Sequence, residues 1–271
     1  VDVVYGIDAQ KTQAFGNPNA GVPGFGTWDA SLDHGSYGWA IPQAYGEIAM
    51  GDLSVKIGHF FTLVGYEVVP ATGNFFYTHA YTMFNSEPFT HTGVLATYSG
   101  MENLTLYGGW TAGWDTGFDS ANSGSNLLGG FSAQVSDPIN FTYINTYGNF
   151  GWRDGGADES YSHSCVLIVD VTDNLQYVGQ SDLVATDDSA GVAYDTVGLN
   201  QYLFYSLNDA VRLGTRLEWW KADGVSYNAV TAGVNFKLLD NLMIRPEYRQ
   251  DWSPGAGIDQ ELVGMDMILT Y

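Results

Sequence analysis

The chain is short of basic residues. Its 271 residues include 9 lysines and arginines against 30 aspartates and glutamates, which gives a net charge of −21 at pH 7. A protein that binds nucleic acid needs a basic surface to meet the phosphates, and this composition does not provide one. We therefore exclude DNA and RNA as partners.

Cysteines and long apolar runs are equally scarce. The single cysteine, Cys165, cannot form a disulfide within the chain, and we expect it to lie in a strand as a small apolar residue. No apolar stretch approaches the roughly 18 residues that a membrane-spanning helix requires. The residues from Val1 onwards already alternate as a strand does, so we expect that an export signal was removed ahead of them. Disulfide scaffolds and helical membrane proteins are excluded.

Aromatic residues and glycines are plentiful where charge is sparse. Charged residues make up 14% of the chain, against about 25% in ordinary soluble domains. Aromatics reach 15%, with 18 tyrosines and 8 tryptophans, and there are 34 glycines. A mean hydropathy of −0.08 fits strands that expose one face to lipid and the other to water. This composition favours a membrane β-barrel, whose aromatic residues gather at the two membrane interfaces.

The stretch 211–221 shows a period of two. Its odd-numbered positions are mostly apolar, whereas its even-numbered positions include Arg212, Arg216 and Glu218. The stretch 242–252 repeats the arrangement, with arginines and acids alternating along one face. Successive side chains of a strand point to opposite faces, so each stretch has one apolar and one charged face. A half-buried soluble sheet would alternate in the same way, and the period alone predicts only strands.

Turn residues separate fourteen such stretches along the chain. We expect strands at 1–10, 41–50, 55–64, 90–99, 104–115, 125–136, 139–150, 161–172, 175–186, 196–207, 210–221, 227–239, 242–252 and 260–271. Short turns such as 137–138 alternate strictly with mostly longer connections, of which 11–40 and 65–89 are the longest. Strands of roughly 9–13 residues suit a tilted bilayer crossing.

These regularities together predict the architecture. An even number of strands allows the first and the last to pair, which leaves no sheet edge in lipid. We predict an all-β fold over 1–271: a single transmembrane, antiparallel, up-and-down β-barrel of about 14 strands in the bacterial outer membrane. Its turns are expected to be periplasmic and its long loops extracellular.

The last expected strand adds a second indication. Met265, Met267, Leu269 and Tyr271 share one face. An apolar alternation that ends in an aromatic residue resembles the assembly signal of outer-membrane barrels, with tyrosine in place of the commoner phenylalanine. The final strand of a soluble sandwich stays open as the alternative.

Six of the nine basic residues lie between positions 212 and 249. A charge that faces lipid at mid-depth costs roughly 2–4 kcal/mol, so we expect those on the less apolar strand faces to point into a watery lumen. The predicted basic wall patch consists of Arg212, Arg216, Lys237, Arg245 and Arg249. The acidic residues predicted to line the pore beside it, and to hold the guanidinium groups in order, are Glu218, Glu247 and Asp251.

The segment 65–89 is too rich in aromatic residues to stand free in water, and it carries Glu67 and Glu87. We favour the hypothesis that it folds into the lumen and faces the basic patch across a constriction, which would select solutes by charge. The alternatives are that it caps the barrel outside or packs against a neighbouring subunit.

Metal and catalytic sites are weakly indicated. Asp115, Asp119 and Asn122 have a spacing that would let their oxygens bind Ca²⁺, but no complete calcium loop is present and a solvated acidic loop is the favoured interpretation. Ser162 and His163 are adjacent in a strand and point to opposite faces, so the histidine cannot activate the serine. We predict no enzymatic activity, and no cofactor beyond Ca²⁺ at acidic loops.

Several short runs resemble one family. They are 56–62 (KIGHFFT), 65–67 (GYE), 87–93 (EPFTHTG), 107–110 (YGGW), 113–115 (GWD), 218–221 (EWWK), 223–227 (DGVSY), 245–247 (RPE) and 251–252 (DW). Over about 41–271 the chain is similar to the OmpL-like β-barrel porins. The resemblance implies an outer-membrane porin and indicates the fold better than the substrate.

Three functions fit these observations. We favour a porin for passive diffusion of small hydrophilic solutes and ions. A substrate-specific channel is the second, with Trp114, Trp152 and Trp220 stacking sugars. A structural or adhesive barrel with acidic surface loops is the third. Expected partners are outer-membrane lipid, small solutes and ions, and further copies of the chain in a homo-oligomer.

Overall fold

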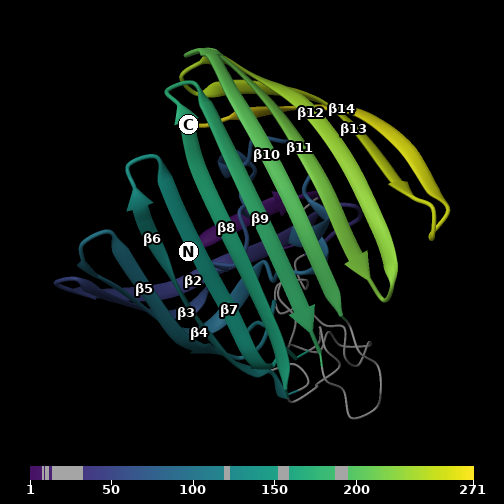
Figure 1. Ribbon diagram of the computed structural model, residues 1–271. Helices are drawn as coiled ribbons and strands as arrows, with labels where there is room; N and C mark the ends of the chain where they lie inside the picture. The colour runs from purple at the N-terminus through teal and green to yellow at the C-terminus, as the bar shows by residue number, and fades with distance from the viewer. Residues whose placement is uncertain (8, 10–11, 14–32, 119–122, 152–158, 187–194) are drawn as a thin grey trace.

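The computed structural model describes residues 1–7, 9, 12–13, 33–118, 123–151, 159–186 and 195–271. Fourteen antiparallel strands form one sheet and follow one another in chain order (Figure 1). Their bounds are β1 Asp2–Gly6, β2 Gly38–Met50, β3 Leu53–Phe61, β4 Thr90–Met101, β5 Leu104–Thr111, β6 Ser125–Ser136, β7 Ile139–Asn149, β8 Ser160–Thr172, β9 Leu175–Ala185, β10 Thr196–Asn208, β11 Val211–Ala222, β12 Val225–Leu239, β13 Leu242–Ser253 and β14 Ile258–Leu269. The predicted all-β fold of antiparallel neighbours is confirmed.

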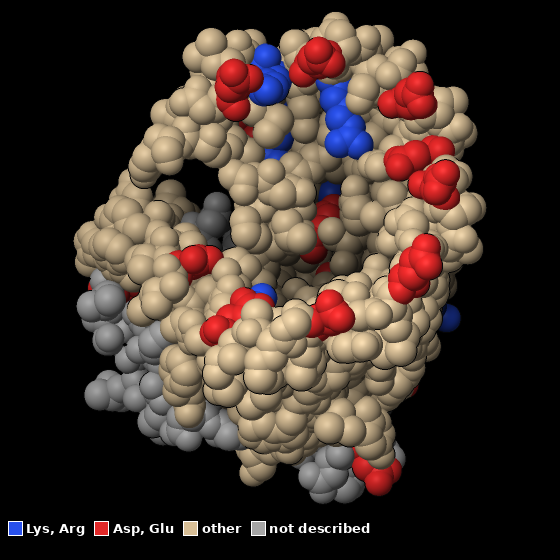
Figure 2. Space-filling view, turned by 90° about the vertical axis from the view of Figure 1, so that its left-hand side faces the viewer, with Lys and Arg blue, Asp and Glu red and all other residues tan. Residues whose placement is uncertain are grey.

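The period of two in the sequence becomes the two faces of this sheet. Large apolar side chains such as Leu199, Leu217 and Met265 are exposed on the outer face, where lipid would cover them. On the inner face, Arg216 and Arg249 occupy one row across the strands, because Thr231 of β12 pairs with both. The sheet curves so that this inner face surrounds a hollow (Figure 2).

The strand ends differ from the predicted ones in a few places. β1 is the clearest case: it stops at Gly6, whereas the alternation predicts a strand to residue 10. Among the described residues, β14 pairs with β13 and β1 pairs with β2, but no pairing joins β14 to β1. The expected hydrogen-bonded closure of the first and last strands is therefore not seen in the described part of the chain.

The turns also follow the predicted alternation. Six hairpins close at the same end of the sheet, each with a turn of two residues between its strands: 51–52, 102–103, 137–138, 173–174, 209–210 and 240–241. The remaining connections lie at the opposite end, and several fall partly outside the described residues (Figure 1). We call these the turn end and the loop end.

The connection between β3 and β4 is the exception to this division, because it enters the hollow. It contains a single 3₁₀ turn, η3 (Ala71–Gly73), and a short helix, α1 (Tyr81–Asn85). It leaves the wall at β3 and reaches β9–β14 on the far side, where its hydrogen bonds join residues up to 174 positions apart. No helix in the described part of the chain is long and apolar enough to cross a membrane.

Candidate functional site: the constricted lumen

A row of glycines on the inner face receives the infolded segment. Gly214 of β11 pairs with Gly233 of β12, Gly233 pairs with Glu247, and Glu247 pairs with Gly264 of β14. The missing side chains leave a shallow groove, which we call the glycine groove. Phe75 lies over Gly214, Phe76 over Gly233 and Tyr77 over Gly264, each in contact with the space that a Cβ atom would occupy. Three consecutive aromatic residues thus cross the strands over three glycines.

Carboxylates of the wall hold the backbone N–H groups of the segment. Glu247, the one large side chain in the glycine row, accepts hydrogen bonds from the N–H of Tyr77 (2.8 Å) and of Thr78 (3.2 Å). Glu218 accepts one from the N–H of Tyr81 at 2.7 Å, at the start of α1. Irregular backbone at membrane depth is tolerated only where its polar groups find partners, and these carboxylates supply them.

Arginines of the wall hold the backbone carbonyl groups of the same segment. Arg245 donates to the carbonyl of Asn74 at 2.6 Å, Arg216 to that of Thr78 at 2.8 Å, and Arg249 to that of His79 at 2.9 Å. Arg216 also lies over the ring of Phe76, with 4.9 Å between the guanidinium carbon and the ring centroid. Side chains of the wall therefore bind both the backbone N–H groups and the backbone carbonyl groups of the segment.

These charges are paired as well as buried. Arg216 bridges Glu67 of the segment (2.6 Å) and Glu218 of its own strand (2.7 Å), and its side chain is 0% exposed. Arg249 contacts Glu218 at 3.0 Å and Asp251 at 2.7 Å. A buried ion pair needs good geometry and further hydrogen bonds to offset its desolvation, and each of these groups has both. We call Glu67, Arg216, Glu218, Arg249 and Asp251 the anchor network.

Glu67 is the member of this network that the segment itself supplies. Burial alone would raise the pKa of its carboxyl group. The guanidinium of Arg216, together with hydrogen bonds from His79 and from the N–H of Ala80 (2.9 Å), outweighs burial and lowers that pKa to about 2. The Tyr202 hydroxyl of β10 donates to the same carboxylate at 3.1 Å. Glu67 is therefore ionised throughout the physiological range.

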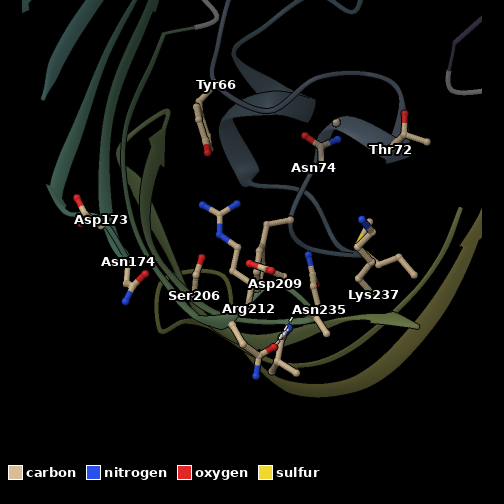
Figure 3. A pocket seen from close by; sticks show the side chains of 16 residues that line it. Tyr66, Thr72, Asn74, Asp173, Asn174, Ser206, Asp209, Arg212, Asn235 and Lys237 are labelled. Atoms are coloured by element: carbon tan, nitrogen blue, oxygen red, sulfur yellow. Dashed lines mark hydrogen bonds between the residues drawn. The ribbon is translucent and has the colours of Figure 1, made fainter. Parts of the chain in front are cut away.

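Two adjoining cavities remain between the segment and the turn end. Their volumes are about 530 Å³ and 640 Å³, and they share the lining residues Asp173, Asn174, Ser206 and Arg212. In Figure 3, Arg212 extends from the wall towards Tyr66 of the segment across the first of them. We call these two cavities the vestibule. Its walls are mainly polar, which suits water and small hydrophilic solutes.

A third cavity, of about 380 Å³, lies between the segment and the β13–β14 part of the wall. The segment contributes His79 and Phe84 to its wall, and the sheet contributes Arg245, Arg249 and Asp266. The segment therefore narrows the lumen without filling it.

The predicted basic patch is divided by this arrangement. All five residues of Arg212, Arg216, Lys237, Arg245 and Arg249 lie on strands of the β11–β13 wall. Arg216, Arg245 and Arg249 are covered by the segment and are at most 7% exposed. Arg212 and Lys237 line the vestibule instead, and Lys237 pairs with Asp240 of the adjacent turn at 2.9 Å.

The predicted acidic residues are likewise brought together, apart from one. Glu218, Glu247 and Asp251 are buried against the segment or the arginines. Glu67 belongs to the anchor network, whereas Glu87 lies elsewhere, against Gln180 of β9.

Of the three residues predicted as possible calcium ligands, the structure describes only Asp115. The Asp115 carboxylate is buried and accepts hydrogen bonds from the N–H groups of Phe89 (2.6 Å) and Thr90 (2.9 Å), at the point where the segment rejoins the wall. Asp119 and Asn122 lie outside the described residues. Asp115 thus has a structural role in fixing the start of β4.

The glycine groove is the part of the site that sequence reasoning missed. Gly214 stands between Arg212 and Arg216 on the charged face of its strand, and Gly264 stands beside Asp266 in the same way. A small residue repeated at lumen-facing positions of neighbouring strands is the signal that would have indicated a docked segment. Its meaning depends on strand register, which the sequence does not reveal.

Comparison with family models gives a match over residues 1–270, to the family described as "Putative beta-barrel porin-2, OmpL-like". None of the curated proteins matches the chain.

Solved structures of porins have similar folds. The anion-selective porin from Comamonas acidovorans aligns with a TM-score of 0.63 and 9% identity, covering 85% of this chain and 76% of that one. The outer-membrane protein OmpT of Vibrio cholerae, in its trimer form, gives a TM-score of 0.59 and 10% identity, covering 84% and 80%. OccK5 (OpdH) of Pseudomonas aeruginosa gives 0.56 and 13%, covering 82% and 68%. Sequence identities this low make these a comparison of folds.

Proposed function

The chain belongs to the OmpL-like β-barrel porin family, and we propose that its lumen carries small hydrophilic solutes and ions across the outer membrane by passive diffusion. The infolded segment is the observation that carries the proposal. It occupies part of the lumen and leaves polar cavities such as the two of the vestibule, of about 530 Å³ and 640 Å³, which favours small solutes over large ones. As a porin, the protein is a channel of the outer membrane and not an enzyme.

A preference for cations is the finer part of the proposal. Each of the six short turns contributes one exposed acid to the mouth at the turn end: Asp52, Glu102, Asp137, Asp173, Asp209 and Asp240. Figure 2 shows Asp and Glu side chains spaced around the rim of the hollow. Rings of acidic side chains raise the local concentration of cations in channels.

The buried arginines do not oppose this preference. Arg216 and Arg249 are paired within the anchor network, and Arg245 is paired with Asp266. These three cations face five carboxylates, those of Glu67, Glu218, Glu247, Asp251 and Asp266, so the constriction carries a net negative charge. Arg212 and Lys237 are the basic residues that we propose act on permeating ions.

Sugar stacking finds no support at two of the three tryptophans considered for it. Trp114 is 1% exposed and stacks on Phe150 with 4.3 Å between ring centroids. Trp220 is buried, donates to the Ser86 hydroxyl at 2.9 Å and lies against Tyr81. Trp152 lies outside the described residues. Diffusion without a stacking site is therefore the function that we favour.

Conductance in planar bilayers tests the proposal. We expect wild-type protein to form ohmic, non-saturating channels that favour K⁺ over Cl⁻. Replacing residues 68–85 by a short glycine-serine linker should raise the single-channel conductance several-fold, because the linker cannot reach the wall. A protein that inserts and remains closed, or that conducts equally with and without the segment, would contradict the proposal.

We further propose that the barrel forms a homo-oligomer. Apolar and aromatic residues such as Leu127, Trp110 and Tyr147 are exposed on the outer face of neighbouring strands β5–β7, where a second copy can pack. Semi-native electrophoresis of cross-linked outer membranes checks this. A single band of monomer mass at every cross-linker concentration would refute it.

A further inference from the structure

A second cluster of buried polar groups lies apart from the anchor network, where the segment returns towards β4. Glu87 projects from the segment onto the β8–β10 wall, and Asp182 of β9 faces it. Both carboxylates are about 1% exposed or less. The glycine at position 65 leaves room for Glu87, whose carboxylate occupies the space that a Cβ atom there would need.

One amide joins the two acids. The Gln180 side-chain nitrogen donates to Glu87 Oε1 and to Asp182 Oδ2, each at 2.7 Å. Its orientation is fixed, since its Oε1 accepts a hydrogen bond from the N–H of Tyr66 at 3.4 Å. Both protons of this amide are thus used, one on each carboxylate.

Further buried oxygens on β8, β9 and β10 have no hydrogen-bond partner. In the described part of the chain these are Asp182 Oδ1, Asn200 Oδ1 and Ser164 Oγ, and all three residues are at most 1% exposed. Ser164 is directly opposite Asp182 in the β8–β9 register, and Asn200 is opposite Gln180 in the β9–β10 register. The Asn200 amide nitrogen donates to the Thr82 hydroxyl of α1 at 2.7 Å, while its oxygen has no hydrogen-bond partner. A buried oxygen without a partner is costly, and three at one place need an explanation.

The two carboxylates also repel each other. Burial and the charge of Asp182 together raise the pKa of Glu87 well above its ordinary value. No lysine or arginine of the described residues forms an ion pair with Asp182. Among the described residues, the cluster therefore lacks a positive charge beside Asp182.

We propose that this cluster is a binding site for one Ca²⁺ ion, coordinated by the carboxylates of Glu87 and Asp182, the amide oxygen of Asn200 and the hydroxyl of Ser164. Two carboxylates balance the charge of a divalent ion, and a hard cation binds oxygens that have no proton to share. A shared proton would relieve the repulsion but would leave the amide oxygen of Asn200 without a partner. Calcium accepts irregular sets of oxygen ligands, whereas Mg²⁺ demands a near-ideal octahedron.

The ion would complete the attachment of the segment. The anchor network holds it to β11 and β13, while Glu87 is bound to β9 on the other side of α1. Calcium at Glu87 would fasten this returning end to three strands, β8, β9 and β10, through Ser164, Asp182 and Asn200. The site is enclosed by protein, so it would stabilise the constriction without lying in the path of solutes.

Isothermal titration of the refolded porin in detergent, stripped with EGTA and free of lipopolysaccharide, tests the proposal with CaCl₂ as the probe. We expect one Ca²⁺ per chain, a weaker response to MgCl₂, and a higher thermal denaturation temperature in Ca²⁺. Asp182→Asn keeps the shape of the side chain and removes its charge, and should reduce the Ca²⁺ affinity at least tenfold. Asp240→Asn, in an exposed turn, is the matched control and should bind Ca²⁺ as the wild type does.

Several outcomes would overturn the site. They are no binding by the wild type, equal binding by Asp182→Asn, and equal loss in the Asp240→Asn control. If Asp182→Asn stabilises the protein and the wild type ignores Ca²⁺, the two acids share a proton only. Should Asp182→Asn fail to fold, Asn200→Ala, which removes one neutral ligand, must still weaken Ca²⁺ binding, and unchanged affinity in that variant counts against the proposal.

Discussion

Arg216 is a charged side chain with no access to water, and it bonds both to the wall and to the segment. Replacing it by alanine leaves Glu67 and Glu218 buried without their cation. Removing one partner of a buried pair costs about 3–5 kcal/mol. We expect Arg216→Ala to release the segment, with a larger and noisier single-channel current and a lower denaturation temperature.

The control for this change is Lys237→Ala. Among the residues that the structure describes, Lys237 forms an ion pair with the exposed Asp240 alone, and its side chain is 52% exposed. That variant should keep the wild-type denaturation temperature. Equal thermal stability of Arg216→Ala and the wild type would show that the network does not hold the segment.

Glu67 makes the attachment of the infolded segment to the wall sensitive to strong acid. Its pKa in the folded protein, about 2, lies below the ordinary value of 4.5. A lowered pKa contributes stability that is fully present above the ordinary value and is lost as the pH falls towards the lowered one. We expect conductance to be constant from pH 7 to about pH 4.5 and to rise between there and pH 2 as the segment loosens. Recordings of Glu67→Gln, which cannot ionise, should show no such rise over that range.

The glycine groove acts through several strands at once. A methyl group at Gly214 would overlap the ring of Phe75, whereas at Gly108 of β5, on the outer face, it would meet nothing within 4 Å. We expect Gly214→Ala to displace Phe75 and to change the single-channel conductance, and Gly108→Ala to leave it unchanged. If both variants conduct as the wild type does, the aromatic residues do not define the narrow part of the lumen.

The strands were easier to predict from the sequence than the contacts between distant parts of the chain. The alternation in stretches such as 211–221 fixes a strand and its two faces, so the lumen-facing side of Arg212, Arg216 and Glu218 follows directly. Which strands those residues meet across the lumen depends on contacts between distant positions, such as Arg245 with Asn74. The sequence therefore indicated charged residues and an aromatic segment, but not that the segment would cover the arginines. The end of β1 at Gly6 was not predicted, because alternation does not mark where strand pairing stops.

The whole molecule presents an acidic mouth to permeating ions. Exposed charges act over roughly 10 Å at 0.1 M salt, so their effect should fade as the ionic strength rises. We expect the preference for K⁺ over Cl⁻, measured as a reversal potential across a KCl gradient, to be stronger at 0.1 M than at 1 M. Neutralising Asp137, Asp173 and Asp209 together should weaken it at low salt, with little effect on protein stability.

Reversal potentials that are the same in this triple variant and in the wild type would refute the role of the mouth. Neutralising Asp195, which lies near the loop end, is the control. This change should leave the reversal potential as it is in the wild type.

The way in which the segment is attached also determines when it can take its place during biogenesis. Its docking surface is made by β9–β14, which follow it in the chain by about 90 residues or more. Contacts between positions this far apart form slowly, because the entropy of closing the intervening chain must be lost first. We therefore expect the strands to pair first and the segment to dock afterwards, so that the lumen is wide until the last step of folding.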